Sequence, residues 1–191
     1  MSVLKVDLDL VQKYNVPGPR YTSYPPATQF TDQIATNVLL GKIRETFVSD
    51  RELSLYFHLP FCQTLCWFCG CTTVITTQQN QSAAYLAYLE KEMNLVAPFL
   101  KPGRKAIQLH FGGGTPTFLQ PDEIRALGRL IHSRFAVAEE VEAGVEIDPR
   151  RVTRDHIKAL REVRFNRASI GIQDNNPEVQ QAVHRIQPLE M

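Results

Sequence analysis

Strand-like and helix-like segments alternate four times along the chain, and this alternation constrains the fold more than any other feature. Short apolar runs and amphipathic spacing predict strands at 53–59, 105–111, 141–147 and 167–172, and helices at 83–97, 121–135, 153–163 and 177–184. Such alternation implies a parallel sheet with right-handed crossovers and helices on its outer face. A closed eight-stranded barrel takes about 250 residues. We therefore expect an incomplete α/β barrel that is open along its last strand, with an unpaired edge and exposed apolar surface.

The N-terminal residues differ from the rest of the chain. Residues 15–28 (NVPGPRYTSYPPAT) contain four of the twelve prolines and predict an extended arm, because proline fixes φ and removes a hydrogen-bond donor. Residues 33–48 predict a first helix. We therefore expect an N-terminal arm and helix over 1–50, followed by an incomplete core domain over 51–191.

Two of the expected helices carry start signals. Pro121 is suited to a first helical position, and acidic residues follow it where the helix dipole favours negative charge. Thr153 is a typical N-cap residue for the helix that comes after it.

Composition and the first residues exclude several classes of partner. The formal net charge of +1 gives no reason to expect nucleic acid or an anionic membrane as a partner. No run approaches the roughly 20 apolar residues that a membrane-spanning helix needs. The segment 1–15 carries Asp7 and Asp9 and lacks the apolar region of a secretory signal. We therefore expect a cytoplasmic protein in a reducing compartment.

The four cysteines of the chain all lie between Cys62 and Cys71. At this density in a reducing compartment, they indicate metal ligands or redox thiols and not a disulfide framework. Cys62, Cys66 and Cys69 have the spacing C-x3-C-x2-C. Three thiolates on one tight loop can hold three irons of a [4Fe–4S] cube and leave the fourth iron open to a small molecule. Phe61, Trp67 and Phe68 would shield such a cluster from solvent.

Three other interpretations of the cysteines fit the sequence less well. A four-cysteine zinc site usually divides its ligands between two separated knuckles, and Cys69 and Cys71 are too close to form two corners. A thioredoxin-like C-x-x-C motif would not explain Cys62 or Cys71. Buried inert thiols are improbable in such a cluster of cysteines.

A run of three glycines, Gly112 to Gly114, ends the second expected strand and is followed by Thr115. In parallel sheets, ligands collect at the carboxyl ends of the strands. Glycines there would let backbone carbonyls approach a cationic ammonium group closely. The alternative is a plain tight turn. A phosphate-binding loop is disfavoured because the Gly-Lys-Ser/Thr ending is absent.

The cysteine motif, which follows a strand and an apolar-Pro stretch, resembles that of the radical S-adenosylmethionine superfamily. Within it, the run C-W-F-C-G-C and the segments GPRYTSYP (18–25), FGGGTPTFL (111–119) and VEIDPR (145–150) resemble the oxygen-independent coproporphyrinogen III oxidases (dehydrogenases). The resemblance extends to about Arg185. It implies a partial (βα)6 TIM-like barrel, truncated here after about four βα units, so further strands and a C-terminal substrate-covering domain would be missing.

The resemblance also implies an activity in porphyrin and haem biosynthesis. In the family, S-adenosylmethionine binds the open iron of the [4Fe–4S] cluster, and an electron cleaves it to give a 5′-deoxyadenosyl radical. The radical abstracts hydrogen from propionates of coproporphyrinogen III, and oxidative decarboxylation leaves the vinyl groups of protoporphyrinogen IX. The family uses two S-adenosylmethionine molecules and an electron donor that the sequence does not identify. The full-length protein is expected to be a monomer.

Residue by residue, the resemblance implies Cys62, Cys66 and Cys69 as cluster ligands. It implies cofactor contacts at Tyr56, Phe68, Gly113, Gly114, Thr115, Glu146, Gln173 and Arg185, and it assigns no catalytic residue. Glu146 would accept hydrogen bonds from ribose hydroxyls, with Asp148 on the same face, and Arg185 would pair with a methionine carboxylate.

Structural alternatives remain open for several of these residues. Glu146 and Asp148 could cap the next element, and Tyr56 and Phe68 could be core aromatics. Arg185, taken without the family, is typical of a solvated surface charge. His58 could lie near the cluster or be a hydrogen-bonded structural histidine.

Three functions are compatible with these features: the oxidase, a haem chaperone and an inactive fragment. Cys71 favours the oxidase over haem chaperones that share the three-cysteine motif. The arm at 18–25 favours it too, and its Arg20 and Tyr21 would contact substrate propionates or cover the site. An inactive truncated fragment that binds at most a cluster is the third possibility.

Overall fold

The computed structural model describes residues 7–16 and 29–191, which divide into two compact units, Met1–Leu40 and Gly41–Met191. In the first unit, helix α1 (Leu8–Tyr14) begins after Asp7, whose carboxylate accepts a hydrogen bond from the Leu10 amide at 3.0 Å. The sequence analysis did not predict this helix.

Helix α2 (Thr36–Glu45) starts in the first unit and ends in the second, and a 3-10 turn at Thr46–Val48 follows it. It confirms the first helix expected within 33–48. The expected arm at 15–28, with Arg20 and Tyr21, lies outside the described residues apart from its first two positions. The expected division into 1–50 and 51–191 stays a prediction.

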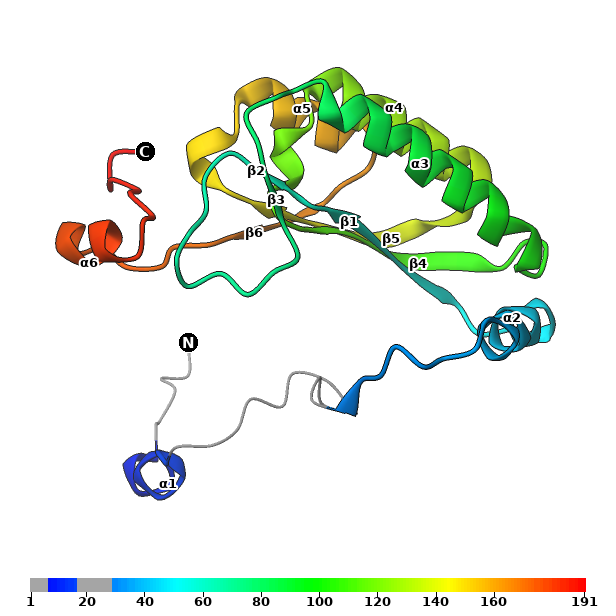
Figure 1. Cartoon of the computed structure of the whole chain (residues 1–191), viewed down its shortest axis with the longest axis horizontal. Helices are drawn as coiled ribbons and strands as arrows, with labels where there is room; N and C mark the ends of the chain where they lie inside the picture. The colour runs from blue at the N-terminus through cyan, green and yellow to red at the C-terminus, as the bar shows by residue number, and fades with distance from the viewer. Residues whose placement is uncertain (1–6, 17–28) are drawn as a thin grey trace. The chain divides into compact units, whose positions relative to one another are not determined.

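The second unit is built on a parallel sheet (Figure 1). Among the described residues this sheet has four strands in the order β1-β4-β5-β6, and every neighbouring pair is parallel. The strands are β1 (Leu53–Leu59), β4 (Lys105–Gly113), β5 (Ala136–Ile147) and β6 (Arg167–Ile170). The predicted class, an α/β fold with a parallel sheet formed by strand–helix units, is confirmed.

Three helices cover one face of the sheet: α3 (Gln81–Val96), α4 (Pro121–Arg134) and α5 (Arg154–Glu162). A 3-10 turn (Ala97–Phe99) extends α3, and α6 (Pro177–Ala182) follows β6. The expected start signals are confirmed, because Pro121 is the first residue of α4 and the Thr153 hydroxyl accepts a hydrogen bond from the His156 amide. No helix in the described part of the chain has the length and apolar character needed to cross a membrane.

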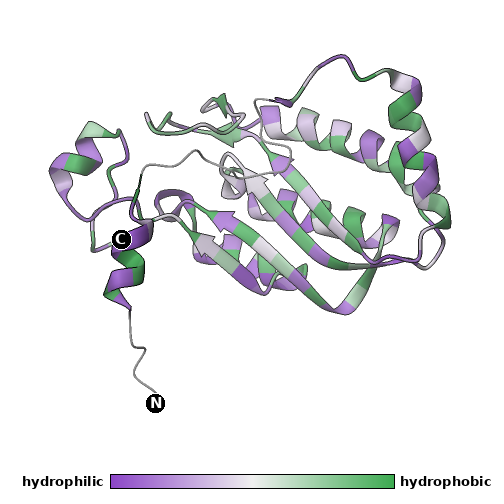
Figure 2. Cartoon of the chain, turned by 90° about the horizontal axis from the view of Figure 1, so that it is seen from below, coloured by the Kyte–Doolittle hydropathy of each residue, from purple (hydrophilic) through white to green (hydrophobic). Residues whose placement is uncertain are grey.

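The core lies between these helices and the sheet, because alternate strand residues point to the same side. Along β5, for example, Val141, Ala143, Val145 and Ile147 are buried, whereas Glu146 is exposed. Figure 2 shows this alternation as hydrophobic and hydrophilic bands along the strands. Besides these β5 residues, the core includes Phe57, Leu59, Leu109 and Phe111 from the sheet, together with Leu89, Met93, Ile124, Leu127, Ile131, Ala159 and Leu160 from the helices.

Two strand boundaries differ from the prediction in ways that affect the site. The second strand was expected to end before the glycines, but β4 continues through Gly113, and Gly112 pairs with His58 of β1. The strand can continue because Gly113 adopts φ 116° and neither glycine carries a Cβ that would meet the Tyr56 and His58 rings. The fourth strand ends at Ile170, two residues earlier than expected.

The expected open edge is present among the described residues, where β6 is the last strand of the sheet. Ile170 and the following Ile172 are exposed there, as predicted for an unpaired edge.

Candidate functional site

The cysteine loop is fixed at its base by backbone hydrogen bonds. Two short strands, β2 (Phe61–Cys62) and β3 (Val74–Ile75), pair in parallel and bring the two ends of the loop together. On the other side, the Gly114 amide donates to the Leu59 carbonyl at 2.9 Å, and the Thr115 amide donates to the Phe61 carbonyl at 2.8 Å. The loop therefore sits at the carboxyl ends of β1 and β4, where a parallel sheet places its ligands.

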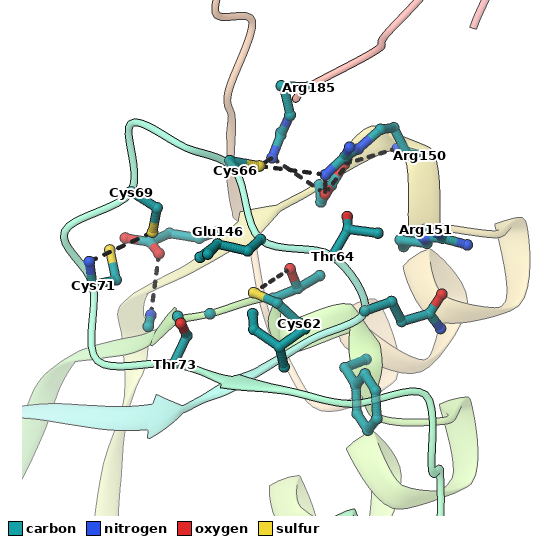
Figure 3. A pocket seen from close by; sticks show the side chains of 18 of the residues that line it. Cys62, Thr64, Cys66, Cys69, Cys71, Thr73, Glu146, Arg150, Arg151 and Arg185 are labelled. Carbon is teal, nitrogen blue, oxygen red and sulfur yellow. Dashed lines mark hydrogen bonds and ion pairs between the residues drawn. The ribbon is translucent and has the colours of Figure 1, made fainter. Parts of the chain in front are cut away.

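All four cysteines line one cavity of about 170 Å³ (Figure 3). Cys66 is buried, Cys62 and Cys69 are partly buried, Cys71 is exposed, and all four are free thiols. The Cys62 Sγ lies 3.4 Å from the Thr115 hydroxyl, and the Cys71 amide donates to the Cys69 Sγ at 3.5 Å. Burial raises the pKa of the Cys62 and Cys71 thiols above the usual value.

Charged groups surround Cys66. The Asp148 carboxylate accepts hydrogen bonds from the Arg150 guanidinium, the shortest at 2.6 Å, and forms an ion pair with Arg185, whose Nη1 lies 3.2 Å from Oδ2. Both guanidinium groups also lie 3.8 Å from the Cys66 Sγ. Burial would raise the pKa of Asp148, but the hydrogen bonds and charge of Arg150 and the charge of Arg185 outweigh it, so this pKa is lowered. Asp148 is therefore held as a carboxylate.

A second polar group lies on the sheet face opposite the helices. The Glu146 carboxylate accepts a hydrogen bond from the Gly113 amide at 3.2 Å and lies 3.5 Å from the His110 Nε2. The His110 ring stacks on Tyr56, with ring centroids 5.9 Å apart. Glu146 is therefore fixed at the rim of the cavity by groups from β4, while its side chain stays partly exposed to a ligand.

His58 is a hydrogen-bonded histidine beneath the cysteine loop. Its Nε2 lies 2.8 Å from the Thr72 carbonyl, which can only accept, so Nε2 carries the proton. The Nδ1 then accepts from the Tyr56 hydroxyl at 3.1 Å. The ring also packs against Gly113, where a Cβ would come within 2.7 Å of it. These contacts agree with the structural alternative that the sequence left open for His58.

The three glycines have packing roles in the structure. A Cβ on Gly114 would lie 2.6 Å from the Pro60 carbonyl oxygen, and one on Gly112 would lie 3.0 Å from the Tyr56 ring. The close approach that requires glycine is therefore the approach of β4 to β1 and to the start of the cysteine loop. Gly113 and Gly114 also line the cavity, so the ligand contact expected of them stays a prediction.

The structure brings together most of the residues that the sequence analysis singled out. The cavity is lined by the expected ligands Cys62, Cys66 and Cys69 and by Phe68, Gly113, Gly114, Thr115, Glu146 and Arg185. Tyr56 lies outside this lining, on the polar face of the sheet beside His110. Gln173 also lies outside it and is exposed. Arg185 is not the solvated surface charge that its type alone suggested, because its side chain is only 12% exposed and pairs with Asp148.

Aromatic shielding of the cysteines differs from the expectation. Phe68 lines the cavity, but Phe61 is buried beneath it, where it stacks on Phe118, and Phe118 itself reaches the lining. Trp67 is exposed and stacks on His184 with ring centroids 5.3 Å apart.

Sequence reasoning missed the contact between the cysteine loop and the segment after α6. The Trp67 amide donates to the Val183 carbonyl at 3.0 Å, and the His184 Nδ1 donates to the Leu65 carbonyl at 2.7 Å. His184 has a positive φ of 55°. No motif marks His184, and only the fold shows that it supports the loop. Arg150 belongs to the VEIDPR segment, but no local pattern indicates its contact with Cys66.

The residues fit a [4Fe–4S] cluster better than a single metal ion. In the part of the chain that the structure describes, no three histidine, cysteine or acidic side chains converge on one ion position. A cubane places each thiolate on a different iron, so its ligands surround a volume and do not meet at a point. Three thiols around one cavity, beside two partly buried guanidinium groups that offset negative charge, match that requirement.

Comparisons with known proteins agree with this site. The Radical SAM superfamily profile matches residues 56–191. Oxygen-independent coproporphyrinogen III oxidases from Escherichia coli K12 and Pseudomonas aeruginosa are 45% and 42% identical over 100% of this chain. The solved structure of coproporphyrinogen III oxidase (HemN) from Escherichia coli, described as a radical SAM enzyme, matches 97% of this chain with a TM-score of 0.83 and 41% identity.

The chain spans 41% of the length of both Escherichia coli proteins and 42% of the Pseudomonas relative. The profile nevertheless covers most of this chain and includes the cysteine loop, the glycine run and Glu146. The chain belongs to the radical S-adenosylmethionine superfamily.

Proposed function

We propose that this chain carries the cluster- and cofactor-binding part of an oxygen-independent coproporphyrinogen III oxidase. The reaction would be the oxidative decarboxylation of two propionates of coproporphyrinogen III to vinyl groups, giving protoporphyrinogen IX. Each propionate would give a hydrogen atom to the 5′-deoxyadenosyl radical and then lose carbon dioxide and one electron, which passes to an electron acceptor of unassigned identity. One observation carries the proposal: Cys62, Cys66 and Cys69 line a single cavity together with Glu146 and Arg185. The names of the relatives support the choice of substrate within the superfamily.

In this proposal, Cys62, Cys66 and Cys69 hold three irons of a [4Fe–4S] cluster. When bound, the cluster with S-adenosylmethionine supplies the reducing electron and the hydrogen-abstracting 5′-deoxyadenosyl radical. The thiols must lose their protons to bind iron, and the two guanidinium groups that lie 3.8 Å from the Cys66 Sγ would offset negative charge there. Cys66 is buried and Cys62 and Cys69 are partly buried, and this burial would limit access of water to the irons.

The other side chains orient the cofactor. Glu146 accepts a hydrogen bond from the Gly113 amide, and because its side chain is 48% exposed, its carboxylate would accept from ribose hydroxyls. Phe68 supplies an aromatic wall, and Thr115 supplies a hydroxyl beside Cys62. Arg185 would pair with a carboxylate at the cavity while Asp148 holds its guanidinium. For Tyr56 and Gln173, which lie outside the cavity lining, contact with S-adenosylmethionine is the role that we propose.

The broader biochemistry follows from the same proposal. The cofactors are a [4Fe–4S] cluster and two molecules of S-adenosylmethionine, and an electron donor of unassigned identity reduces the cluster. We place the protein in the cytoplasm as a monomer when full length, without a nucleic-acid or membrane partner.

The first test is anaerobic reconstitution with iron and sulfide. Electron paramagnetic resonance of the reduced protein, with and without S-adenosylmethionine, reports on the cluster and its open iron. We expect a [4Fe–4S] signal that changes when the cofactor is added. Cys66→Ala should abolish the signal, whereas the matched variant Cys71→Ala should keep it, because Cys66 is one of the three proposed ligands and Cys71 is not. A wild-type protein that binds zinc or no metal while circular dichroism shows a folded chain would refute the cluster assignment.

The second test addresses the substrate. The part of the Escherichia coli relative that the chain does not cover would be added as a separate polypeptide, and conversion of coproporphyrinogen III would be followed by chromatography. Formation of protoporphyrinogen IX supports the oxidase. Tight binding of haem to a cluster-loaded chain without any decarboxylation would favour a haem chaperone instead.

A further inference from the structure

Arg150 is held in one position by Asp148. Its Nε lies 3.0 Å and 3.1 Å from the two carboxylate oxygens, and its Nη2 lies 2.6 Å from Oδ2. The Arg150 backbone amide also donates to Oδ1 at 3.1 Å. Both side chains are shielded, with 15% and 7% of their surfaces exposed. Two-point pairing of a planar guanidinium with a carboxylate fixes orientation as well as distance.

The same Arg150 Nη2 that contacts Asp148 lies 3.8 Å from the Cys66 Sγ, within the range of a hydrogen bond to sulfur. Cys66 is 84 positions earlier in the chain, on the cysteine loop. Figure 3 shows Arg150 and Arg185 converging on this sulfur from two different segments. Asp148 therefore holds the Arg150 guanidinium so that its Nη2 can donate to the Cys66 sulfur, a proposed iron ligand.

We propose that Arg150, held by Asp148, is a positioning residue that donates a hydrogen bond to the Cys66 sulfur and raises the reduction potential of the cluster. This inference rests on the proposed function, because Cys66 must ligate iron. Hydrogen bonds to cluster sulfurs and nearby positive charge stabilise the reduced, more negative state. Their effect is strong where water does not screen the charge.

A purely structural role for Arg150 makes a different prediction. The Asp148 carboxylate also caps the 3-10 turn Pro149–Arg151 by accepting from the Arg150 backbone amide, and the Arg150 side chain holds that carboxylate in place. If holding the carboxylate were the only role of this side chain, replacing Arg150 would lower the stability of the protein and leave the potential of the loaded cluster unchanged. The potential therefore separates the two roles.

The experiment compares wild type, Arg150→Gln, Arg150→Lys and Arg151→Gln after anaerobic reconstitution. Arg151 is the matched control, because it lines the same cavity, is exposed, and makes no hydrogen bond to a cysteine sulfur within the described residues. Redox titration followed by electron paramagnetic resonance gives the midpoint potential, and circular dichroism and iron content verify folding and loading.

We expect R150Q to lower the midpoint potential of the cluster by about 59 mV, which for one electron raises the ratio of oxidised to reduced cluster about tenfold at a fixed potential. R151Q should lower the midpoint potential clearly less. R150K keeps the charge but cannot pair at two points and reach the sulfur at once, so its midpoint should fall between those of wild type and R150Q.

Equal midpoints for R150Q and R151Q would overturn the inference and leave the proposed function intact. If R150Q does not fold or load, R150K decides: a lowered midpoint supports the inference, and a wild-type midpoint overturns it. A folded wild-type chain that binds no cluster would overturn both proposals.

Discussion

Replacing Gly114 by alanine should separate the end of β4 from the start of the cysteine loop. A Cβ built on Gly114 lies 2.6 Å from the Pro60 carbonyl oxygen and 2.8 Å from that of Phe61. Both obstacles are backbone atoms, so they cannot rotate away as a flexible side chain could. The backbone must therefore move, and the hydrogen bonds on either side of Gly114 must lengthen.

The cost can be worked from these contacts. The Gly114–Leu59 and Thr115–Phe61 backbone hydrogen bonds, at 2.9 Å and 2.8 Å, are the first to be strained. Each is worth about 0.5–1.5 kcal/mol, and overpacking a filled site costs about 1–3 kcal/mol. We therefore expect Gly114→Ala to lower the free energy of unfolding by about 2–6 kcal/mol, a large share of the roughly 5–15 kcal/mol typical of a domain.

Urea unfolding followed by circular dichroism measures this change. Gly70→Ala is the matched control within the same loop, because a Cβ at Gly70 meets nothing within 4 Å. Its free energy of unfolding should stay within about 0.5 kcal/mol of wild type. If Gly114→Ala unfolded at the same urea concentration as Gly70→Ala, the close approach would not constrain this position and the reasoning would be refuted.

Three further predictions concern stability away from this contact. Gly128→Ala places a Cβ 2.4 Å from the Val163 side chain and should lower the free energy of unfolding by about 1–3 kcal/mol. Adding Val163→Ala should recover part of that loss, whereas two additive losses would contradict the clash. Thr153→Ala removes the N-cap of α5 and should cost about 0.5–2 kcal/mol in urea unfolding, and an unchanged midpoint would show that the cap is dispensable. The pKa of Asp148 is lowered in the folded protein, so the stability that its carboxylate contributes is present at neutral pH and is lost as pH falls from about 4 through the folded pKa. Between pH 5 and 2, Asp148→Asn should therefore lose less stability than wild type, and parallel pH profiles would contradict this.

The fold and the identity of the thiol site could be predicted from sequence because local patterns carry them. The apolar run Leu53–Leu59 predicts β1 with its observed boundaries. Capping depends on neighbours a few positions apart, so Thr153 was assigned correctly. The spacing of Cys62, Cys66 and Cys69 placed three thiols on one loop, and strand–helix alternation placed that loop at the ligand edge of the sheet.

The tertiary structure alone decided which charges and backbones meet. Arg150 reaches Cys66 across 84 positions, and Arg185 reaches it across 119, so no local pattern could reveal either contact. The structural reason for Gly114 lies in the approach of the Pro60 carbonyl, which depends on how β1 and β4 pair. Periodicity and spacing report neighbours along the chain, whereas the surroundings of the Cys66 sulfur are assembled by the order of strands in the sheet.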